Sequence, residues 1–330
     1  MKNHTVLFEN RPSIVSYAAV VGKKEGEGPL AARFDQIFDD TTLGEASWEK
    51  AESMMQAAAL RIALRKGELT AQDIECTFAG DLLNQCIGSS FGLLEFGIPQ
   101  VGLYGACSTM ALSLAMAAIF VGFGVSRQVA AVTSSHFCSA ERQFRFPIVY
   151  GGQRTPTAQW TVTGSGAAIV SQGNGVNISA VTIGKMIELG VKDANNMGAA
   201  MAPAAADTIK AHINAVGARP SDYDLILTGD LGKIGSRLLC ELLEKDGLSI
   251  RDVHNDCGLM IYDLKKQDVH AGGSGCGCSA SVLCSEILQR FEEGSLRRVL
   301  FCATGALMST TSSQQGEAIP GIAHAVELVR

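Results

Sequence analysis

The sequence predicts a layered α/β protein in which one βαβαβ unit occurs twice and five layers stack in the order α/β/α/β/α. In both halves of the chain, short apolar runs alternate with helical segments of about 10 to 20 residues, which is typical of a parallel or mixed sheet covered by helices. Short strings also recur in the same order in the two halves. Finally, the segment Met110 to Val125 is apolar on every side, so we expect a helix buried between two sheets. The predicted halves comprise residues 1–186 and 187–330.

The first half contains two predicted helices and three predicted strands. Ser47 is suited to cap a helix that ends at Gly67, because serine accepts backbone hydrogen bonds at helix starts and glycine favours helix ends. A second, apolar helix begins at Cys107 and extends to about Val125. The predicted strands are Ile74–Ala79, Val101–Tyr104 and Val129–Thr133.

The second half repeats this order. A helix over Pro203–Gly217, a strand over Leu225–Thr228, a helix that begins at Cys278 and a strand that begins near Arg297 follow one another. Three strings recur in sequence: Gly80-Asp81-Leu82 as Gly229-Asp230-Leu231, Cys107-Ser108 as Cys278-Ser279, and Arg127-Gln128-Val129 as Arg297-Arg298-Val299. Ordered recurrence of this kind indicates a duplicated supersecondary unit.

Composition argues against several classes of protein. The 330 residues include 27 basic and 33 acidic side chains, which give a formal charge of −6, and the sequence has no Lys/Arg cluster. Such a chain lacks the basic footprint of a nucleic-acid binder, and we do not expect charge alone to hold it to an anionic membrane.

One stretch is long enough to cross a membrane, because residues 96–126 contain no Asp, Glu, Lys or Arg. Pro99, Gly102 and Gly105 interrupt it, so we expect a buried strand followed by a buried helix and no transmembrane segment. The start of the chain lacks the apolar run of a secretory signal, and the ten cysteines are not spaced as a disulfide framework. We therefore expect an intracellular protein.

The sequence favours neither a metal nor a cofactor. Cys276, Cys278 and Cys284 lack a second pair at Cys-x-x-Cys spacing, so they make a poor zinc signature. The glycine-rich run at residues 22–28 lacks the strand and helix context of a phosphate-binding loop. We expect no metal ligand and no cofactor.

Cys107 is the strongest candidate for a reactive residue. It follows a predicted strand and begins a helix, so we expect unpaired backbone N–H groups and the helix dipole to favour its thiolate and to lower its pKa. The alternative is a small residue buried where the helix packs close to its strand.

Asp81 and Asp230 occupy equivalent strand ends in the two halves. They are suited to receive the proton of a bound acid or to bind a metal such as calcium. Alternatively they cap the helices that follow, which is the commoner role of Asp at helix starts.

Four longer strings carry a family resemblance. They are Phe78–Gln85 (FAGDLLNQ), Thr133–His136 (TSSH), Ala140–Pro147 (AERQFRFP) and Thr163–Ala168 (TGSGAA). With Gly-Ala-Cys-Ser-Thr at the start of the central helix, they resemble the stage V sporulation protein AD family of the thiolase-like superfamily, over nearly the whole chain.

The resemblance implies a thiolase-like fold, similar to that of thiolases and β-ketoacyl synthases. It implies a protein without catalytic turnover that binds dipicolinate (pyridine-2,6-dicarboxylate), free or as its calcium chelate, for uptake into the developing spore. It further implies a homodimer in the forespore or spore, peripheral to the inner membrane, that acts with other stage V sporulation A membrane proteins.

The same resemblance makes Cys107 and Cys302 relic nucleophile candidates and not catalytic residues. The cysteine at the place of Cys107 accepts an acyl group in the superfamily, and thiolases use a second cysteine at the place of Cys302. Asp230, however, stands where condensing enzymes carry a His, and a glycine-rich run (272–278) stands where they show a second His or Asn. His270 lies just upstream of this run, and a shifted alignment places it at the position of that second His. For Cys302 an ordinary buried core position is the alternative.

A rigid aromatic dianion needs helix N-terminal amides or Arg side chains for its carboxylates and an apolar or aromatic wall for its ring. Residues 135–154 hold the densest set of cations and aromatic rings: His136, Arg142, Arg145, Arg154, Phe144, Phe146 and Tyr150. For each Arg, a solvated loop or a dimer contact is the alternative. The expected ligand-binding residues are Cys107, Ser108, His136, Arg142, Arg145, Asp81 and Asp230.

Three functions remain open at this point. The first is a dipicolinate-binding protein that acts with membrane partners. The second is an acyl-CoA or acyl-carrier condensing enzyme that uses Cys107. The third is a dimeric scaffold of a spore membrane complex with an empty relic pocket.

Overall fold

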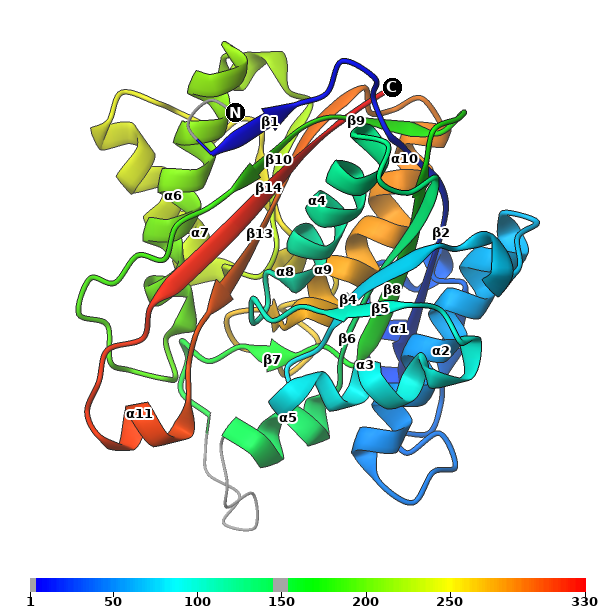
Figure 1. Ribbon diagram of the computed structural model, residues 1–330. Helices are drawn as coiled ribbons and strands as arrows, with labels where there is room; N and C mark the ends of the chain where they lie inside the picture. The colour runs from blue at the N-terminus through cyan, green and yellow to red at the C-terminus, as the bar shows by residue number, and fades with distance from the viewer. Residues whose placement is uncertain (1–3, 145–153) are drawn as a thin grey trace.

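Two sets of five strands form the framework of the protein in the computed structural model, which describes residues 4–144 and 154–330 (Figure 1). The first set has the order β5-β4-β6-β8-β2 and the second the order β11-β10-β13-β14-β9. The first set comprises β5 (Gln100–Gly102), β4 (Cys76–Gly80), β6 (Gln128–Ser135), β8 (Gly164–Ser171) and β2 (Ser13–Gly22). The second comprises β11 (His254–Asp256), β10 (Leu225–Thr228), β13 (Arg298–Ala306), β14 (Gly321–Val329) and β9 (Val176–Ile183).

The strand directions repeat from one set to the other. β4 is parallel to β5 and β6, and β8 runs antiparallel to both β6 and β2. In the second set β10 is parallel to β11 and β13, and β14 runs antiparallel to both β13 and β9. The predicted duplication of a layered α/β unit is therefore confirmed. A short pairing of Ser13 with Asn177 and of Ile14 with Val176 joins the two sets at one corner.

Helices lie on the outer faces of the two strand sets and between them. One outer layer contains α2 (Trp48–Lys66) and the other contains α6 (Met197–Val216) and α7 (Gly232–Lys245). The central layer contains α4 (Thr109–Gly122) and a continuous helix formed by α9 (Cys276–Val282), a π-helical turn (Leu283–Ile287) and α10 (Leu288–Glu292) (Figure 1). Each helix layer forms its own hydrophobic core with the sheet, so the five predicted layers are present.

Shorter elements complete the described chain. The helices are α1 (Lys23–Gly26), α3 (Ile87–Gly92), α5 (Phe137–Phe144), α8 (Cys257–Met260) and α11 (Thr310–Gln314). β1 (Thr5–Leu7) pairs with β9, β3 (Gln36–Phe38) pairs with β2, and β7 (Trp160–Thr161) pairs with β12 (Gly273–Ser274). Within the described ranges, no helix combines the length and the apolar character needed to span a membrane.

Local sequence signals predicted several elements well. Ser47 caps α2, since its Oγ accepts a hydrogen bond from the N–H of Lys50 at 3.3 Å. The strand predicted at Leu225–Thr228 is observed with the same bounds. By contrast, the helix predicted from Pro203 begins at Met197, and the helix predicted from Cys278 begins at Cys276.

The strand after Pro99 differs from the expectation of a buried strand. All three residues of β5 are exposed, because β5 is the last strand of the sheet and its outer edge is unpaired in the described chain. α4 is mainly buried, as expected, although Met116, Ile119 and Phe120 are only partly covered. β9 precedes residue 187 but pairs with β14 in the second set, and the division of the chain at residues 186 and 187 remains a prediction.

Candidate functional site

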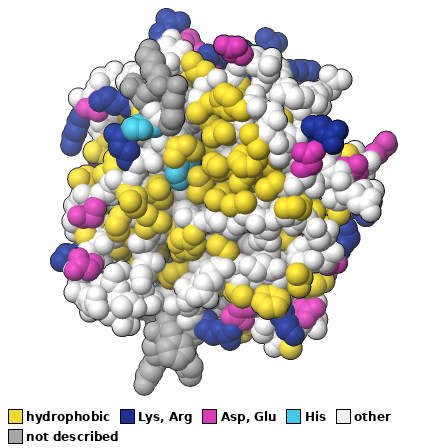
Figure 2. Space-filling model, viewed as in Figure 1, with side chains coloured by type: hydrophobic (Ala, Val, Ile, Leu, Met, Phe, Trp, Pro, Cys, Tyr) yellow, Lys and Arg dark blue, Asp and Glu magenta, His cyan; other side chains and the backbone are white. Residues whose placement is uncertain are grey.

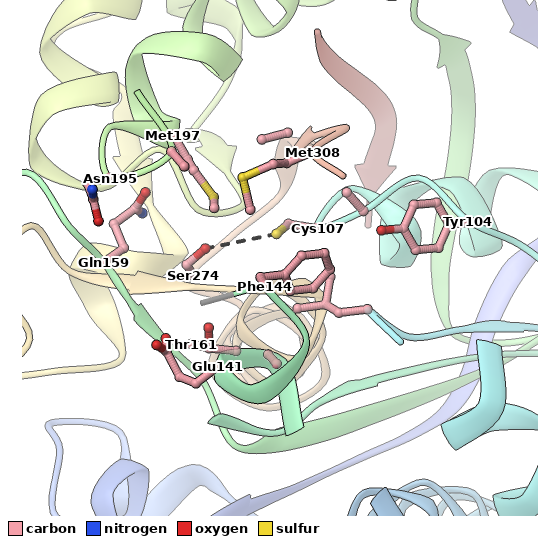
Figure 3. Close-up of a pocket in the computed structure, with 15 residues that line it drawn as sticks. Tyr104, Cys107, Glu141, Phe144, Gln159, Thr161, Asn195, Met197, Ser274 and Met308 are labelled. Atoms are coloured by element: carbon pink, nitrogen blue, oxygen red, sulfur yellow. Dashed lines mark hydrogen bonds between the residues drawn. The ribbon is translucent and has the colours of Figure 1, made fainter. Parts of the chain in front are cut away.

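The start of α4 places Cys107 at the floor of a pocket between the two halves (Figure 3). Ala106 has a positive φ of 49°, which turns the chain sharply before the helix. β13 approaches this turn closely, because a Cβ added to Gly305 would lie 3.2 Å from the backbone nitrogen of Cys107. A glycine is therefore needed there for the two halves to meet at the cysteine.

About 580 Å³ of space lies between the atoms that line the pocket, open solvent at its mouth included, and the walls are mainly apolar. Met197 and Met308 lie on one side of Cys107 and Phe144 lies on the other (Figure 3). Its polar lining consists of Tyr104, Glu141, Gln159, Thr161, Asn195 and Ser274. Among the described residues, no Lys, Arg or His lines this pocket.

Asp230 lies directly behind the pocket and organises its polar side. Its carboxylate accepts hydrogen bonds from Ser274 Oγ at 3.0 Å, from the N–H of Gly275 at 3.1 Å and from Thr304 Oγ1 at 2.7 Å. The side chain is fully buried, and burial raises its pKa even though these donors lower it. Asp230 thus joins segments of the second half behind the floor of the pocket. It does not cap α7, because the N–H groups of Leu231 and Gly232 at the start of that helix donate to Asp256.

The structure contradicts the expectation that Cys107 has a lowered pKa. Burial raises the pKa of the thiol well above its ordinary value, and the negative charge of the nearby Asp230 carboxylate raises it further. Cys107 Sγ also lies 3.9 Å from Ser274 Oγ. The helix start does not compensate for these effects, so the thiol stays protonated at neutral pH.

Gln159 holds the wall of the pocket in a fixed orientation. Its Nε2 group donates to the carbonyl oxygen of Asp230 at 2.6 Å and to that of Gly273 at 2.9 Å. Both amide hydrogens are used, so the side-chain oxygen Oε1 is left as an acceptor.

Of the other residues predicted to bind a ligand, Ser108 lies next to Cys107 but points into the helix start, where its Oγ donates to the carbonyl of Gly105 at 2.6 Å. Asp81 is buried and caps the turn after β4, because it accepts from the N–H groups of Leu83 and Ser89. The structure therefore does not bring Asp81 into the pocket.

His136 does not line the pocket either. Its Nδ1 accepts from the N–H of Cys138 at 3.2 Å, so the ring proton lies on Nε2 and is donated to the carbonyl of Thr41 at 2.7 Å. Burial lowers the pKa of His136. The ring is neutral and fully bonded, which removes it as a partner for a carboxylate.

The predicted arginines are not gathered at Cys107. Arg142 pairs with Glu49 on the surface, and its guanidinium lies 5.5 Å from the ring centre of Trp48. Arg154 binds Asp268 at 2.7 Å, away from the pocket. Arg145, Phe146 and Tyr150 lie outside the described residues.

The second-half candidates are also placed elsewhere. Cys302 is buried in the outer core cluster with α6, on the face of β13 opposite the central layer, and burial raises its pKa to about 12. His270 lies near the surface and contacts Asp268 and the carbonyl of Thr155. Within residues 4–144 and 154–330, no group of three or more His, Cys, Asp or Glu side chains is arranged to hold a metal ion.

Sequence reasoning missed most of the residues that meet at Cys107. Ser274 belongs to the glycine-rich run that was singled out, and Asp230 was a candidate from the repeat. Gln159, Asn195 and Met308 carried no signal, because each comes from a different segment and only the fold brings it to the pocket.

A family model described as Stage V sporulation protein AD (SpoVAD) matches residues 2–329. The chain belongs to this family. It is 46% identical over 327 residues to Stage V sporulation protein AD of Bacillus subtilis (strain 168), which covers 99% of this chain and 96% of that protein. The family resemblance noted in the sequence is thereby confirmed.

Solved structures similar to this chain include two other kinds of protein. One is 3-oxoacyl-[acyl-carrier-protein] synthase III from Aquifex aeolicus VF5, with a TM-score of 0.58, 12% identity and coverage of 97% of this chain and 100% of that chain. Another is cerulenin-bound OleA of Xanthomonas campestris, with a TM-score of 0.64, 13% identity and coverage of 100% and 99%. At this identity the likeness shows the fold alone, and the thiolase-like fold is confirmed.

Proposed function

We propose that this protein binds dipicolinate in the pocket beside Cys107 without catalytic turnover and hands it on during uptake into the developing spore. The observation that carries the proposal is the buried Asp230 carboxylate, linked to Cys107 through Ser274, in a chain of the stage V sporulation protein AD family. A nucleophile needs a thiolate, and the neighbouring buried carboxylate opposes it.

The surroundings of the cysteine support the absence of acyl chemistry. A general base must lie within hydrogen-bonding reach of the group that it deprotonates. His136 and His270 are bonded elsewhere, and no histidine lines the pocket in the described part of the chain. A carboxylate at Asp230 would also repel a developing oxyanion or enolate.

The pocket suits a flat aromatic ligand with two polar ends. Phe144, Met197 and Met308 supply apolar walls for a ring. Asn195, Thr161 and Tyr104 carry N–H or O–H groups that can donate to carboxylate oxygens. The acidic side chains at and behind the pocket, Glu141 and Asp230, favour a ligand whose charge is partly neutralised, as in the calcium chelate.

We further propose that the chain acts with other stage V sporulation A proteins in the membrane of the forespore, to which it is peripheral. The family supports this, since transport across a membrane requires a spanning partner and no helix of the described residues has the length and hydropathy to span one. A homodimer belongs to the same proposal.

An exposed apolar surface supports the homodimer. Figure 2 shows apolar side chains gathered over α4 and beside β5. At the edge strand itself Val101 is 43% exposed, and on the flanking elements Phe91, Leu94 and Phe123 are each at least 65% exposed. An open strand edge with apolar side chains on both sides fits a second copy that continues the sheet across a two-fold axis.

Calorimetry with pyridine-2,6-dicarboxylate, with and without calcium, tests the ligand proposal. We expect saturable binding by the wild type, weaker binding of pyridine-3,5-dicarboxylate, and no adduct by mass spectrometry after exposure to acetyl-CoA. Cys107→Ala should change the affinity, whereas Cys302→Ala is the matched control outside the pocket. An acyl adduct on Cys107 without dicarboxylate binding would contradict this proposal and favour the condensing enzyme. If the protein neither binds dicarboxylate nor forms an adduct, the scaffold is the function that remains.

A further inference from the structure

Basic side chains from three distant segments meet on the surface beside Trp160. The contacts join Lys24 to the carbonyl of Asp268 at 3.2 Å, Arg154 to the same carbonyl at 3.1 Å, and Gln267 to the carbonyl of Lys24 at 2.7 Å. We call the following residues the basic patch: Lys23, Lys24, Arg154, Lys265, Lys266 and His270. The sequence has no Lys/Arg cluster because these residues lie up to about 240 positions apart, and the fold assembles one.

The centre of the basic patch is arranged around one carboxylate. Arg154 Nη2 lies 2.7 Å from Asp268 Oδ2, and His270 Nε2 lies 3.0 Å from Asp268 Oδ1. Lys24 Nζ lies 3.8 Å from the ring centre of Trp160, and the Arg154 guanidinium lies 4.6 Å from it. Phe137 stacks on Trp160 with ring centres 3.8 Å apart, so a rigid aromatic base holds the cations in place.

The charges of the patch are not balanced internally. Its five Lys and Arg residues, with His270 beside them, have four neighbouring acidic side chains, Glu25, Glu27, Asp263 and Asp268, in a chain whose formal charge is −6. Burial and the positive charge of Arg154 lower the pKa of Lys24, which shows that the cations repel one another. Arg154 Nη1 is buried and has no hydrogen-bond partner among the residues that the structure describes.

Exposure shows how a ligand would enter. The Asp268 side chain is 72% exposed, whereas that of Arg154 is only 17% exposed. The carboxylate therefore lies at the rim and the cation beneath it. Asp268 can turn outward without disturbing the core, and a carboxylate from another molecule can then take its place.

We propose that the basic patch binds an acidic segment of a protein partner, with a carboxylate of that segment replacing Asp268. The geometry favours a peptide over an anionic membrane. A bilayer attracts exposed lysines that are spread over a surface, whereas Arg154 and His270 converge on the carboxylate of Asp268, Lys24 binds the backbone carbonyl of the same residue, and Arg154 is largely covered. This proposal does not depend on dipicolinate binding.

Fluorescence anisotropy with fluorescein-labelled decaglutamate at low salt tests the proposal on the full chain. We expect saturable binding that Arg154→Gln weakens about fivefold or more, and that the exposed pair Lys265→Glu with Lys266→Glu weakens similarly. Asp268→Asn should tighten binding about fivefold, because it removes the competing carboxylate. Asp252→Asn, which makes the same charge change at an exposed site, is the matched control, and thermal denaturation verifies that each variant is folded.

Three results would overturn the proposal. Decaglutamate that does not bind the wild type removes the surface as an acidic-peptide site. If Asp268→Asn and Asp252→Asn change the affinity for decaglutamate equally, the interaction depends only on the net charge of the protein. Sedimentation with phosphatidylglycerol vesicles, together with failure to bind decaglutamate, would assign the patch to a lipid surface instead.

Discussion

Ser274 links the thiol of Cys107 to the carboxylate of Asp230 in the interior, since its Oγ lies 3.9 Å from Cys107 Sγ and 3.0 Å from Asp230 Oδ2, although Cys107 and Asp230 come from different halves of the chain. Asp230 is held in place by Ser274, Gly275 and Thr304, so the carboxylate cannot turn away from the thiol without losing three hydrogen bonds. The pair couples the start of the central helix to the second strand set and keeps the sulfur protonated.

Asp230→Asn should make Cys107 more reactive. The substitution removes the negative charge that raises the pKa of the thiol, so the thiolate fraction at pH 8 increases. We expect iodoacetamide to alkylate Cys107 at least about tenfold faster, as measured by mass spectrometry of the peptide. The exposed change Asp252→Asn should leave the rate as in the wild type. An unchanged rate in Asp230→Asn would show that burial alone controls this cysteine.

Gln159→Ala should lower both the stability of the fold and the affinity of the pocket for dicarboxylate. The change leaves the carbonyl oxygens of Asp230 and Gly273 without their amide donor, and a buried unpaired polar group costs about 1 to 3 kcal/mol. We therefore expect the free energy of unfolding in urea to fall by about 2 to 4 kcal/mol, with loss of dicarboxylate affinity. Gln172→Ala, at an exposed position, is the control and should change stability by less than about 0.5 kcal/mol.

Stability should fall at acidic pH through Glu327. Buried Glu327 accepts hydrogen bonds from His212, Ser179 and Tyr223, and these donors outweigh burial and lower its pKa to about 2. Because the unfolded state takes up this proton at higher pH than the folded state, the stabilisation is present above pH 4.5 and is lost as the pH falls towards 2.

Denaturation curves of Glu327→Gln measure this contribution. The wild type should lose about 2 to 3 kcal/mol from this group between pH 5 and pH 2, and the variant should show a shallower decrease over the same range. The same exchange at exposed Glu317 should not alter the slope. A slope in Glu327→Gln equal to that of the wild type would assign acid sensitivity to other carboxylates.

Val101→Lys should disrupt the proposed homodimer. A lysine on the exposed edge strand β5 places two like charges near the two-fold axis and hinders pairing of the strands. Sedimentation velocity should then show a shift from dimer to monomer. Leu189→Lys adds the same charge at a side chain that is 67% exposed and distant from β5 in sequence, and it should remain dimeric. A dimeric Val101→Lys variant would exclude pairing through this edge.

Elements with a strong local signal were predictable from the sequence. The cap at Ser47 and the apolar run of β10 depend on neighbouring residues, and both elements were observed close to their predicted bounds. Pro203 suggested a helix start, since proline favours the first turn, but α6 begins six residues earlier because the preceding segment packs against the second strand set. The antiparallel strands β2, β8, β9 and β14 were not predicted from the sequence, although each is 8 to 10 residues long.

The candidate site was predictable only in part. Cys107 and Asp230 are candidates from their positions at a helix start and in a repeat, and in the structure Ser274 links them. The shift of the Cys107 pKa was predicted in the wrong direction, because its position at a helix start says nothing of burial near a carboxylate. His136 follows the end of a strand expected to point toward Cys107, and Arg142 belongs to a cationic and aromatic stretch, but both side chains are bonded to residues of other segments.

The sequence by itself determined the duplicated five-layer α/β fold and the family, because periodic apolar residues and ordered strings are properties of the chain's order. Only the tertiary structure decided which polar groups meet. Gln159 and Ser274 reach the pocket, and Lys24 reaches Arg154, because strands far apart in sequence become neighbours in the sheet. Those neighbours set the burial and the local charge around each side chain. Burial and charge together determine the pKa of a thiol or a basic side chain, and hence its protonation state.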